Sequence, residues 1–583
     1  MAPPEPLPPG ADPARFSAGR ALGHLRVIAA APRPLGSLHH GSVRDYLVEH
    51  LRRLDLEVEV QRASWSARVF GWIRGASVHN VVGRLRGRGE GAAVLLAAHY
   101  DTVPNSPGAD DDGAGVAALL EAARALRAGP PLERDVIFLL TDAEELGLLG
   151  AMAFVAEHPW ARDAFVALNF EARGVRGPSA MFEVTGNQAV ALRAFGRADR
   201  RPVGNSLIAA LAKLLPNDTD LTVLRGVVGA GLNFALPDGL ARYHTPLDSL
   251  DNLDPGSLQH HGDHAVDIAR WAASETRAVE LAGERIYFDA IGRALISYPS
   301  WGAYPLAVAL VVVFVAAVRQ QHRRQQPTLW LSAAAWQGLG WLLALGVVQL
   351  AAALVLWAVP AQLVLAFPGR FAVGYLALAA AEYAAAQRWI ERRGGDPHLG
   401  AAALWMIPAL VTPLVLPGAS YLFQWVVLLS LTQRLLGRHV PAAAPPKAAR
   451  WGRTVLTAAV SIPPVFLAAS MVYMVLVLDG GLTPAVPVAF AGLWVVAVTP
   501  AFARWTIRGR VAGAVACAAA GLLLLTGSVL FTGFDRASPR LGPLLYALSA
   551  DTGQSHWITP GPAADPYLAG LFGPHLVPVA IPD

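Results

Sequence analysis

Residues 98–115 contain the side chains in this chain that are best suited to chemistry. His99 follows an apolar run, residues 92–97, whose composition predicts a buried strand. A histidine at a strand end supplies a nitrogen ligand, and Asp101 can accept its second ring N–H and thereby select the tautomer. The acidic run 110–112, bounded by glycines, then precedes an apolar segment that predicts a helix. This order of residues indicates a metal site.

Two glutamates and a second histidine extend the pattern downstream. Glu144 and Glu145 follow a short apolar strand, and adjacent carboxylates at a strand end point in different directions. One of them can bind a metal while its neighbour stays free to take a proton from an attacking water. Glu171 closes another predicted strand, and His244 lies in the loop 243–248.

Each feature alone has a simpler explanation. A single His-x-Asp is more often a strand-end histidine hydrogen-bonded to a neighbour, and three aspartates more often begin a solvated helix or form a calcium-type loop. The glutamate pair would ordinarily be exposed, and His244 would ordinarily be a turn histidine before proline. Their occurrence together, largely at the ends of successive predicted strands, favours metal-assisted catalysis.

The elements that must position these residues alternate between strand and helix over residues 16–285. This alternation predicts an α/β domain with a mixed, mainly parallel sheet flanked by helices. Sheets of that kind bind ligands at the carboxyl ends of their strands, and that is where four of the candidates fall: His99, Glu144, Glu145 and Glu171. Residues 1–15 are rich in proline and are predicted to be disordered.

Apolar segments after residue 300 predict an all-α transmembrane domain over residues 300–532. Most of the segments approach the length of about 20 residues that a bilayer crossing needs, and we expect eight of them: 302–318, 334–357, 371–387, 400–416, 419–436, 455–477, 482–502 and 511–532. Arginine and lysine gather in alternate connections, which the positive-inside rule places in the cytoplasm. Both chain ends are therefore expected on the extracytoplasmic side of a bacterial-type cytoplasmic membrane, with a small β-leaning tail over residues 535–583.

The start of the chain and the interior of the spans lead to two further expectations. The first 14 residues contain no apolar segment, so a signal anchor is expected upstream of this sequence. Ionisable residues are sparse in the spans, which is typical of an anchor or scaffold rather than a pump. Glu382 is the exception, and we expect it near an interface beside Arg388.

Composition excludes several classes of protein. Charged residues make up 15% and apolar residues 54% of the 583 positions, whereas soluble domains contain roughly 25% charged residues. The net charge of +4 comes from basic residues at the ends of apolar segments, so it does not indicate a nucleic-acid partner. The single cysteine, Cys517, excludes an intrachain disulfide. The oligomeric state stays open.

Four motifs together resemble the zinc-dependent aminopeptidase (dizinc exopeptidase) family over about residues 16–275: His99-x-Asp101, 107–115, Glu144-Glu145-x-Gly147 and Tyr243-His244-Thr245. That family includes secreted bacterial leucyl aminopeptidases, glutamate carboxypeptidase II and the glutaminyl cyclases. Further segments look similar to its membrane-bound branch, the endoplasmic reticulum metallopeptidases and vacuolar membrane proteases: residues 169–174, 216–220, 287–289, 546–553 and Trp557.

The resemblance implies two Zn²⁺ ions, with the ligands His99, Asp111, Glu145, Glu171 and His244. Asp111 would bridge both ions, His99 and Glu171 would complete one site, and the other two ligands would complete the second. Two dications against three carboxylates and one hydroxide sum to zero charge, which a partly buried site tolerates best. Many relatives have aspartate where this chain has Glu171, a difference that the membrane branch shares.

The resemblance also implies that Glu144 is the general base and that Asp101 orients His99. It predicts a membrane-anchored metallopeptidase that hydrolyses peptide substrates near chain ends, with an aminopeptidase as the leading form. The alternatives are a glutaminyl cyclase-like acyltransferase on the same scaffold, a carboxypeptidase of the related zinc clan, and a non-catalytic peptide-binding membrane scaffold or transporter. The other histidines considered are expected to be solvated: His39, His40, His158, His260 and His261.

Overall fold

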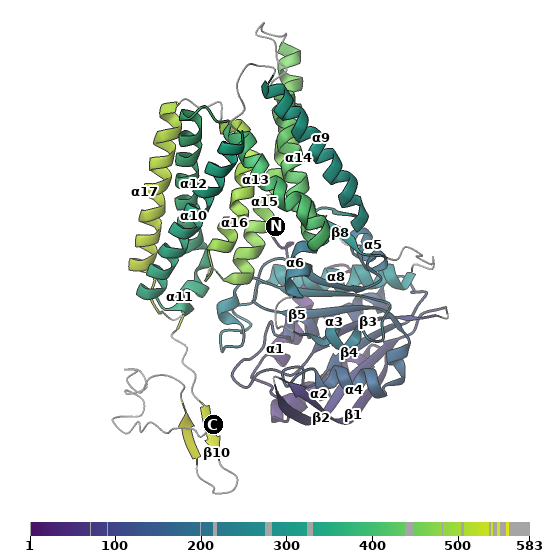
Figure 1. The fold of residues 1–583 in the computed structure, drawn as a ribbon. Helices are drawn as coiled ribbons and strands as arrows, with labels where there is room; N and C mark the ends of the chain where they lie inside the picture. The colour runs from purple at the N-terminus through teal and green to yellow at the C-terminus, as the bar shows by residue number, and fades with distance from the viewer. Residues whose placement is uncertain are drawn as a thin grey trace. The chain divides into compact units, whose positions relative to one another are not determined.

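The computed structural model describes residues 2–69, 71–89, 91–198, 200–213, 218–274, 283–322, 330–437, 447–480, 482–502, 507–535, 538–539, 545–548 and 555–558. The chain divides into two compact units, residues 1–531 and 532–583. The first unit contains an α/β domain followed by a helical region (Figure 1). In the described part of the second unit, β10 (Leu545–Leu548) and β11 (Ser555–Ile558) pair antiparallel. The rest of the predicted tail, with most of the segment 546–553, lies outside the described residues.

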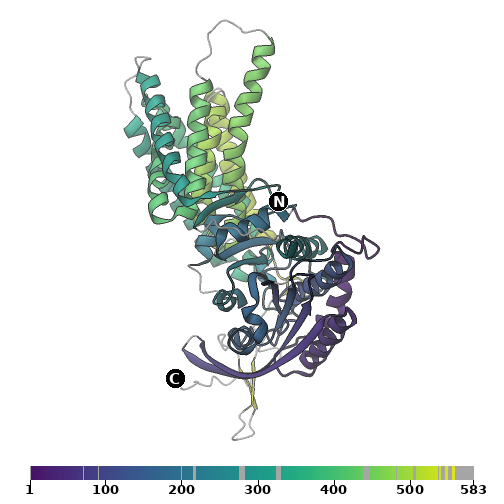
Figure 2. The same ribbon diagram turned by 90° about the vertical axis from the view of Figure 1, so that its right-hand side faces the viewer.

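A seven-stranded mixed sheet forms the centre of the α/β domain. Its strands are β1 (Glu57–Val69), β2 (Trp72–Leu85), β3 (Ala93–His99), β4 (Val136–Thr141), β5 (Ala164–Ala172), β6 (Ala180–Gly186) and β7 (Ala230–Leu236). Their order in space is β1-β2-β4-β3-β5-β7-β6. The central strands β4, β3, β5 and β7 run parallel, and antiparallel strands flank them on both sides. The predicted mixed α/β class is confirmed, and the long β1–β2 pair curves along one edge (Figure 2).

Helices cover both faces of this sheet: α1 (Ala18–Ile28), α2 (Leu38–Arg53), α3 (Gly113–Ala128), α4 (Leu149–Glu157), α5 (Gln188–Ala198), α6 (Ser206–Ala212), α7 (Asp220–Leu224) and α8 (Pro255–Ser274). Successive side chains of a strand point to opposite faces. Leu96 accordingly packs in the core that contains α1, α3 and α8, whereas its neighbour Leu95 packs in the core that contains α4 and α7. The central strands are therefore buried on both faces and are apolar throughout.

The carboxyl ends of the parallel strands meet at one edge of the sheet. β3 ends at His99, which lies in register with Thr141 at the end of β4. β5 runs beside β3 and brings Glu171 to the same edge. The acidic run then leads into α3, where the Asp112 side chain caps the helix by accepting from the N–H of Gly115 at 3.1 Å. The sheet thus gathers the candidate residues from distant parts of the sequence.

The N-terminal segment, predicted to be disordered, instead lies along the α/β domain. The N–H of Leu7 donates to Gln259 Oε1 at 2.9 Å, and the Ser17 hydroxyl donates to the carbonyls of Leu7 and Pro8. Arg20 and Arg124 donate to further carbonyls between residues 9 and 15. Proline-rich backbone has few N–H donors of its own, so these long side chains supply the hydrogen bonds that hold the segment.

A short hairpin, β8 (Arg285–Asp289) and β9 (Leu295–Pro299), leads into the helical region: α9 (Ala303–His322), α10 (Trp330–Ala358), α11 (Ala361–Ala366), α12 (Pro368–Arg392), α13 (Pro397–Val415), α14 (Ser420–Gly437), α15 (Lys447–Asp479), α16 (Ala485–Phe502) and α17 (Ile507–Phe531). Among the described residues, four helical segments are long and apolar enough to cross a membrane: Ser300–His322, Trp330–Ala358, Pro397–Val415 and Val511–Phe531. The region is suited to a membrane, and the number of eight spans stays a prediction.

The helical region packs directly on the α/β domain. The ring of Phe288 in β8 stacks on Tyr421 in α14, with ring centroids 4.7 Å apart. The Ser206 hydroxyl donates to the carbonyl of Gly418 at 2.7 Å. On another side, α11 contacts the turn Leu240–Arg242, which immediately precedes the loop of His244. The helices therefore touch an element that carries a candidate site residue.

Candidate metal centre

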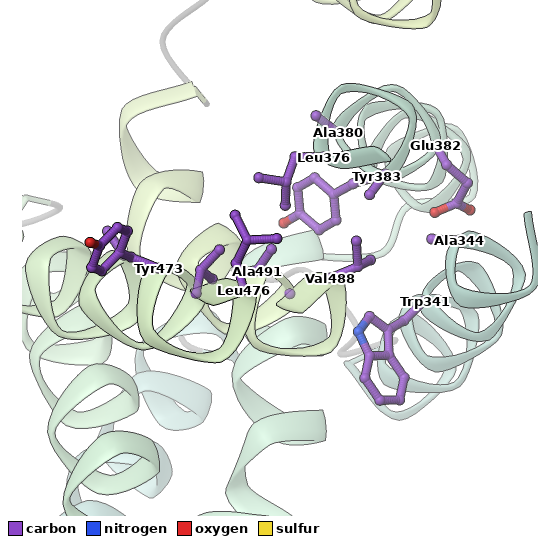
Figure 3. Close-up of a pocket in the computed structure, with 14 residues that line it drawn as sticks. Trp341, Ala344, Leu376, Ala380, Glu382, Tyr383, Tyr473, Leu476, Val488 and Ala491 are labelled. Atoms are coloured by element: carbon purple, nitrogen blue, oxygen red, sulfur yellow. The ribbon is translucent and has the colours of Figure 1, made fainter. Parts of the chain in front are cut away.

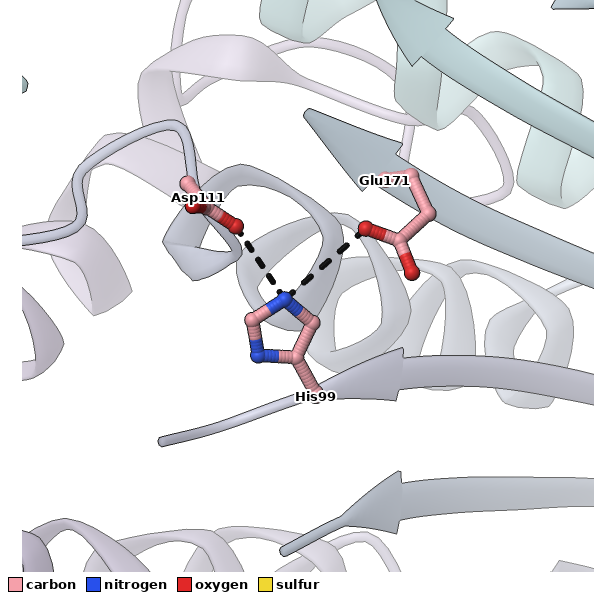
Figure 4. Close-up of side chains that lie close together, drawn as sticks. All are labelled: His99, Asp111 and Glu171. Atoms are coloured by element: carbon pink, nitrogen blue, oxygen red, sulfur yellow. Dashed lines mark hydrogen bonds and ion pairs between the residues drawn. The ribbon is translucent and has the colours of Figure 1, made fainter. Parts of the chain in front are cut away.

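Side chains from two strands and one loop meet at the carboxyl edge of the sheet (Figure 4). His99 Nε2, at the end of β3, lies 3.1 Å from Asp111 Oδ1 and 3.8 Å from Glu171 Oε2. All three residues are buried, and their ligand atoms lie within 4.8 Å of one another. Zinc contacts nitrogen and carboxylate oxygen at about 2.0–2.2 Å, so one cation can reach all three atoms.

A second group of three shares Asp111. His244 Nε2 lies 2.9 Å from Asp111 Oδ2 and 3.4 Å from Glu145 Oε2, and these atoms also fall within 4.8 Å of one another. Asp111 turns one oxygen toward His99 and the other toward His244, so its carboxylate joins the two groups. The His244 side chain is 36% exposed, which makes the second group the one open to solvent. All five predicted ligands thus lie together.

Buried carboxylates dominate the electrostatics of the site. Burial raises the pKa of Glu171 and of Glu144 well above their ordinary values, and neighbouring carboxylates add to the rise. Burial opposes a charge on His244, yet Asp111 and Glu145 raise the pKa of that imidazole to about 10. The carboxylates therefore favour positive charge at both imidazoles. Divalent cations would supply the same positive charge and leave the imidazoles neutral, as metal ligands require.

The residues present fit zinc. Two imidazole nitrogens and three carboxylates form the nitrogen and oxygen donor set that Zn²⁺ accepts. Glu145 Oε1 is buried and makes no hydrogen bond within the described structure. Buried polar atoms ordinarily have a partner, and a cation between the two groups would provide one.

Asp101 connects the first histidine to the glutamate pair. It lies 3.5 Å from His99 Nδ1, a distance beyond an ordinary hydrogen bond. Its two oxygens accept instead from the backbone N–H groups of Glu144 at 3.1 Å and Glu145 at 3.2 Å. Asp101 therefore holds the backbone turn that presents both glutamates. Glu144 belongs to neither ligand group. Its side chain is half-buried, and its charge interacts with those of His99 and Glu171.

Two residues that support the site had no predicted role. Asp248, in the same loop as His244, accepts from the N–H groups of Asp110 at 2.7 Å and Asp111 at 3.1 Å. Arg33 is fully buried and donates to the carbonyls of Tyr100, Pro107 and Gly108 at 2.7, 2.6 and 3.0 Å. Asp248 ends the loop 243–248 that contains His244, so the sequence offered a signal that it lies near the site. Arg33 lies between two prolines, and nothing in its neighbourhood in the sequence points to a partner.

Several histidines expected to be solvated are buried: His40, His158, His260 and His261. His40 Nε2 lies 2.8 Å from Asp142 Oδ1. The other oxygen of Asp142 accepts from the N–H of His79 at 2.8 Å. The Ser179 hydroxyl lies 2.8 Å from His261 Nδ1. His40, His260 and His261 each have a ring-nitrogen partner distant in sequence, which a local pattern does not reveal.

Residues 80–269 match the family model described as Peptidase family M28. This part of the chain is a peptidase family M28 domain. The M28 domain contains four of the five predicted ligands on its strands and acidic loops, and the fifth, His244, near its end. The family is one of zinc-dependent peptidases, so the predicted resemblance is confirmed for this domain.

Membrane proteins are among the relatives of the M28 domain. The chain is 30% identical over 308 residues to "Endoplasmic reticulum metallopeptidase 1" of Mus musculus, covering 49% of this chain and 34% of that protein. It is 32% identical over 339 residues to a "Vacuolar membrane protease" of Schizophyllum commune, covering 53% and 36%. The chain therefore spans about a third of the length of these relatives.

Solved structures are similar to a little under half of the chain. An aminopeptidase from Aneurinibacillus sp. strain AM-1 covers 46% of this chain and 97% of its own, with a TM-score of 0.38 and 14% identity. A glutaminyl cyclase of Porphyromonas gingivalis covers 44% and 98%, with a TM-score of 0.35 and 21% identity.

Proposed function

We propose that this protein is a membrane-anchored dizinc metallopeptidase that hydrolyses peptide bonds near chain ends, with aminopeptidase activity as its leading form. The observation that carries the proposal is the Asp111 carboxylate, which turns one oxygen to each of two ligand groups. A carboxylate shared in this way is suited to two neighbouring cations. His99 and Glu171 would complete one zinc site, and His244 and Glu145 would complete the other.

The residues of this chain then divide the work of hydrolysis. Bound zinc supplies a Lewis acid that polarises the peptide carbonyl and lowers the pKa of water. Glu144 takes a proton from the attacking water and delivers it to the leaving amine. It belongs to neither ligand group, and its charge interacts with His99, Glu171 and Glu145. Asp101 holds the Glu144 backbone at 3.1 Å and so keeps that carboxylate at the edge of the site.

A digest of a peptide library by the purified full chain, with and without chelator, tests this function. We expect trimming from the amino end that chelator abolishes and zinc restores. Glu144→Gln should lower kcat by roughly 10²–10⁴-fold while zinc stays bound, and Glu133→Gln, at an exposed glutamate, is the matched control. Full hydrolysis by Glu144→Gln would contradict the assigned base. Cyclised amino-terminal glutamine would instead indicate acyltransfer, and bound zinc without turnover would indicate a binding scaffold.

We further infer that the M28 domain lies on the extracytoplasmic side of a bacterial-type cytoplasmic membrane. The support is the alternation of basic connections between apolar helices, as at Arg319 and Arg434 near the ends of α9 and α14. Protease added to right-side-out vesicles should then degrade the M28 domain and spare it in inverted vesicles. The reverse pattern would place the domain in the cytoplasm.

A further inference from the structure

The helical region contains a cavity of about 360 Å³ between α10, α12, α15 and α16. Figure 3 shows Trp341, Leu376, Tyr383 and Leu476 around it. Within the part of the chain that the structure describes, the lining includes neither lysine nor arginine nor histidine, and alanine, leucine and valine make up most of it. Its volume lies within the range of about 300–1,000 Å³ that is typical of small-molecule pockets.

Among the described residues, one carboxylate lines this cavity. Glu382 of α12 lines it and is half-buried. Its carboxylate lies against α10, because a Cβ placed on Gly340 would be 3.2 Å from Glu382 Oε1. Among the described residues, Glu382 has neither a hydrogen bond nor an ion pair, in contrast to Glu391 of the same helix, which lies 4.0 Å from Arg388. The expected position beside Arg388 is therefore not observed as an ion pair.

We propose that this cavity binds a single-chain lipophilic amine, with the aliphatic chain against the apolar wall and the ammonium on Glu382. An acidic residue among apolar membrane helices is costly unless it has a partner, and such residues commonly mark a functional site. No cationic side chain of the described residues lines the cavity, so the counter-charge is expected from a ligand or from the solvent. The ammonium would donate charge-assisted hydrogen bonds to the carboxylate.

The same lining disfavours other amphiphiles. A fatty acid would bring a second carboxylate beside Glu382, and the two charges would repel each other. A phospholipid would bring a phosphate, which binds best to arginine or lysine, and neither is found among the described lining residues. A fatty alcohol would fill the apolar volume equally well but would lack the ion pair. These differences in head group provide the test.

The test uses the full chain in phosphatidylcholine nanodiscs and a dodecylamine that carries a mid-chain diazirine. Dodecanol and dodecanoate with the same diazirine are the matched probes, and mass spectrometry maps the photo-crosslinks. We expect the amine to label α10, α12, α15 or α16 and to be displaced by unlabelled dodecylamine. Glu382→Gln should lower amine labelling roughly tenfold or more, since a hydrogen bond to a charged group is lost, and should leave alcohol labelling unchanged.

A second variant separates binding from folding. Ala491→Leu narrows the cavity and keeps Glu382, so it should reduce labelling by the amine and the alcohol alike. Glu391→Gln on the same helix and Ala353→Leu on an exposed position of α10 are the controls, and both should label as the parent does. Equal labelling by all three probes, labelling that survives Glu382→Gln or Ala491→Leu, or crosslinks outside these four helices would overturn the proposal. Since it concerns the helices alone, its failure leaves the peptidase function untouched.

Discussion

The carboxylate of Asp248 accepts a hydrogen bond from the backbone N–H of Asp111 at 3.1 Å, and its other oxygen accepts from the N–H of Asp110 at 2.7 Å. Asp248 is buried and follows His244 by four residues. The loop that carries one histidine of the centre therefore also fixes the backbone of the shared aspartate. Both ligand groups depend on these two hydrogen bonds, because both groups contain Asp111.

Asp248→Asn should weaken zinc binding by roughly 10–100-fold, because supporting hydrogen bonds commonly contribute that much to metal affinity. The amide replaces one accepting oxygen by an N–H₂ group, which would face a backbone donor. Competition with a chromogenic chelator measures the affinity. Asp251→Asn, at an exposed position of the same loop region, is the control. Unchanged zinc affinity in Asp248→Asn would mean that the backbone of Asp110 and Asp111 keeps its position without the two hydrogen bonds to Asp248.

Arg33→Lys should destabilise the M28 domain by about 1–3 kcal/mol, because several buried carbonyls lose their donor. The guanidinium fork reaches the carbonyls of Tyr100, Pro107 and Gly108 at once, and an ammonium has neither its reach nor its planar geometry. Chemical denaturation, monitored by the release of zinc, measures the change in the free energy of unfolding. The exposed Arg26 provides the matched control, Arg26→Lys, and equal stability of the two variants would contradict the supporting role of Arg33.

Gly480→Ala should disturb the M28 domain from within the helical region. Gly480 has φ of +64°, and a Cβ there would lie 2.3 Å from a methyl carbon of Leu365 and 3.3 Å from one of Leu240. Leu240 belongs to the turn just before His244. We expect a lower apparent melting temperature, by an amount equivalent to roughly 1–2 kcal/mol, together with reduced peptidase activity.

Gly346→Ala is the control for that variant, because a Cβ on Gly346 of α10 meets nothing within 4 Å. Alanine at an open helical position should be neutral or slightly stabilising. Normal activity in Gly480→Ala, with only its melting temperature lowered, would show that the contact stabilises the chain without shaping the loop of His244.

The stability of the α/β domain should fall as the pH drops below about 6.5. Burial, and then the neighbouring His50 and Arg124, lower the pKa of His24 to about 3, and its Nδ1 lies 2.7 Å from the Tyr46 hydroxyl. Between about pH 3 and 6.5 the unfolded chain therefore binds more protons at this position than the folded chain. The free energy of unfolding must decrease with falling pH over this window.

At pH 5 His24 alone should lower the free energy of unfolding by about 1–2 kcal/mol. His24→Asn keeps a polar partner for Tyr46 but does not titrate, so its apparent melting temperature should change less between pH 7 and pH 5. An identical pH profile for parent and variant would assign the acid sensitivity to other groups.

The sequence alone determined the class of the first half and the residue types of the centre. A parallel strand that is buried on both faces must be apolar, so the polar residues directly after 93–98 and 136–140 stand out, as do Asn169 and Glu171 at the carboxyl end of 165–172. Because carboxyl ends of parallel strands share one edge, their convergence followed from the pattern. Apolar length marked the helices after residue 300 in the same way.

Only the tertiary structure decided how equivalent residues divide their roles. Three consecutive aspartates look alike in sequence, yet Asp112 accepts from the backbone of His99 and Gly115 while Asp111 faces both histidines. Arg33 and Asp248 act through partners 67 to 138 residues away along the chain. Local periodicity reports which face of an element is apolar, whereas hydrogen bonds between distant segments exist only once the chain has folded.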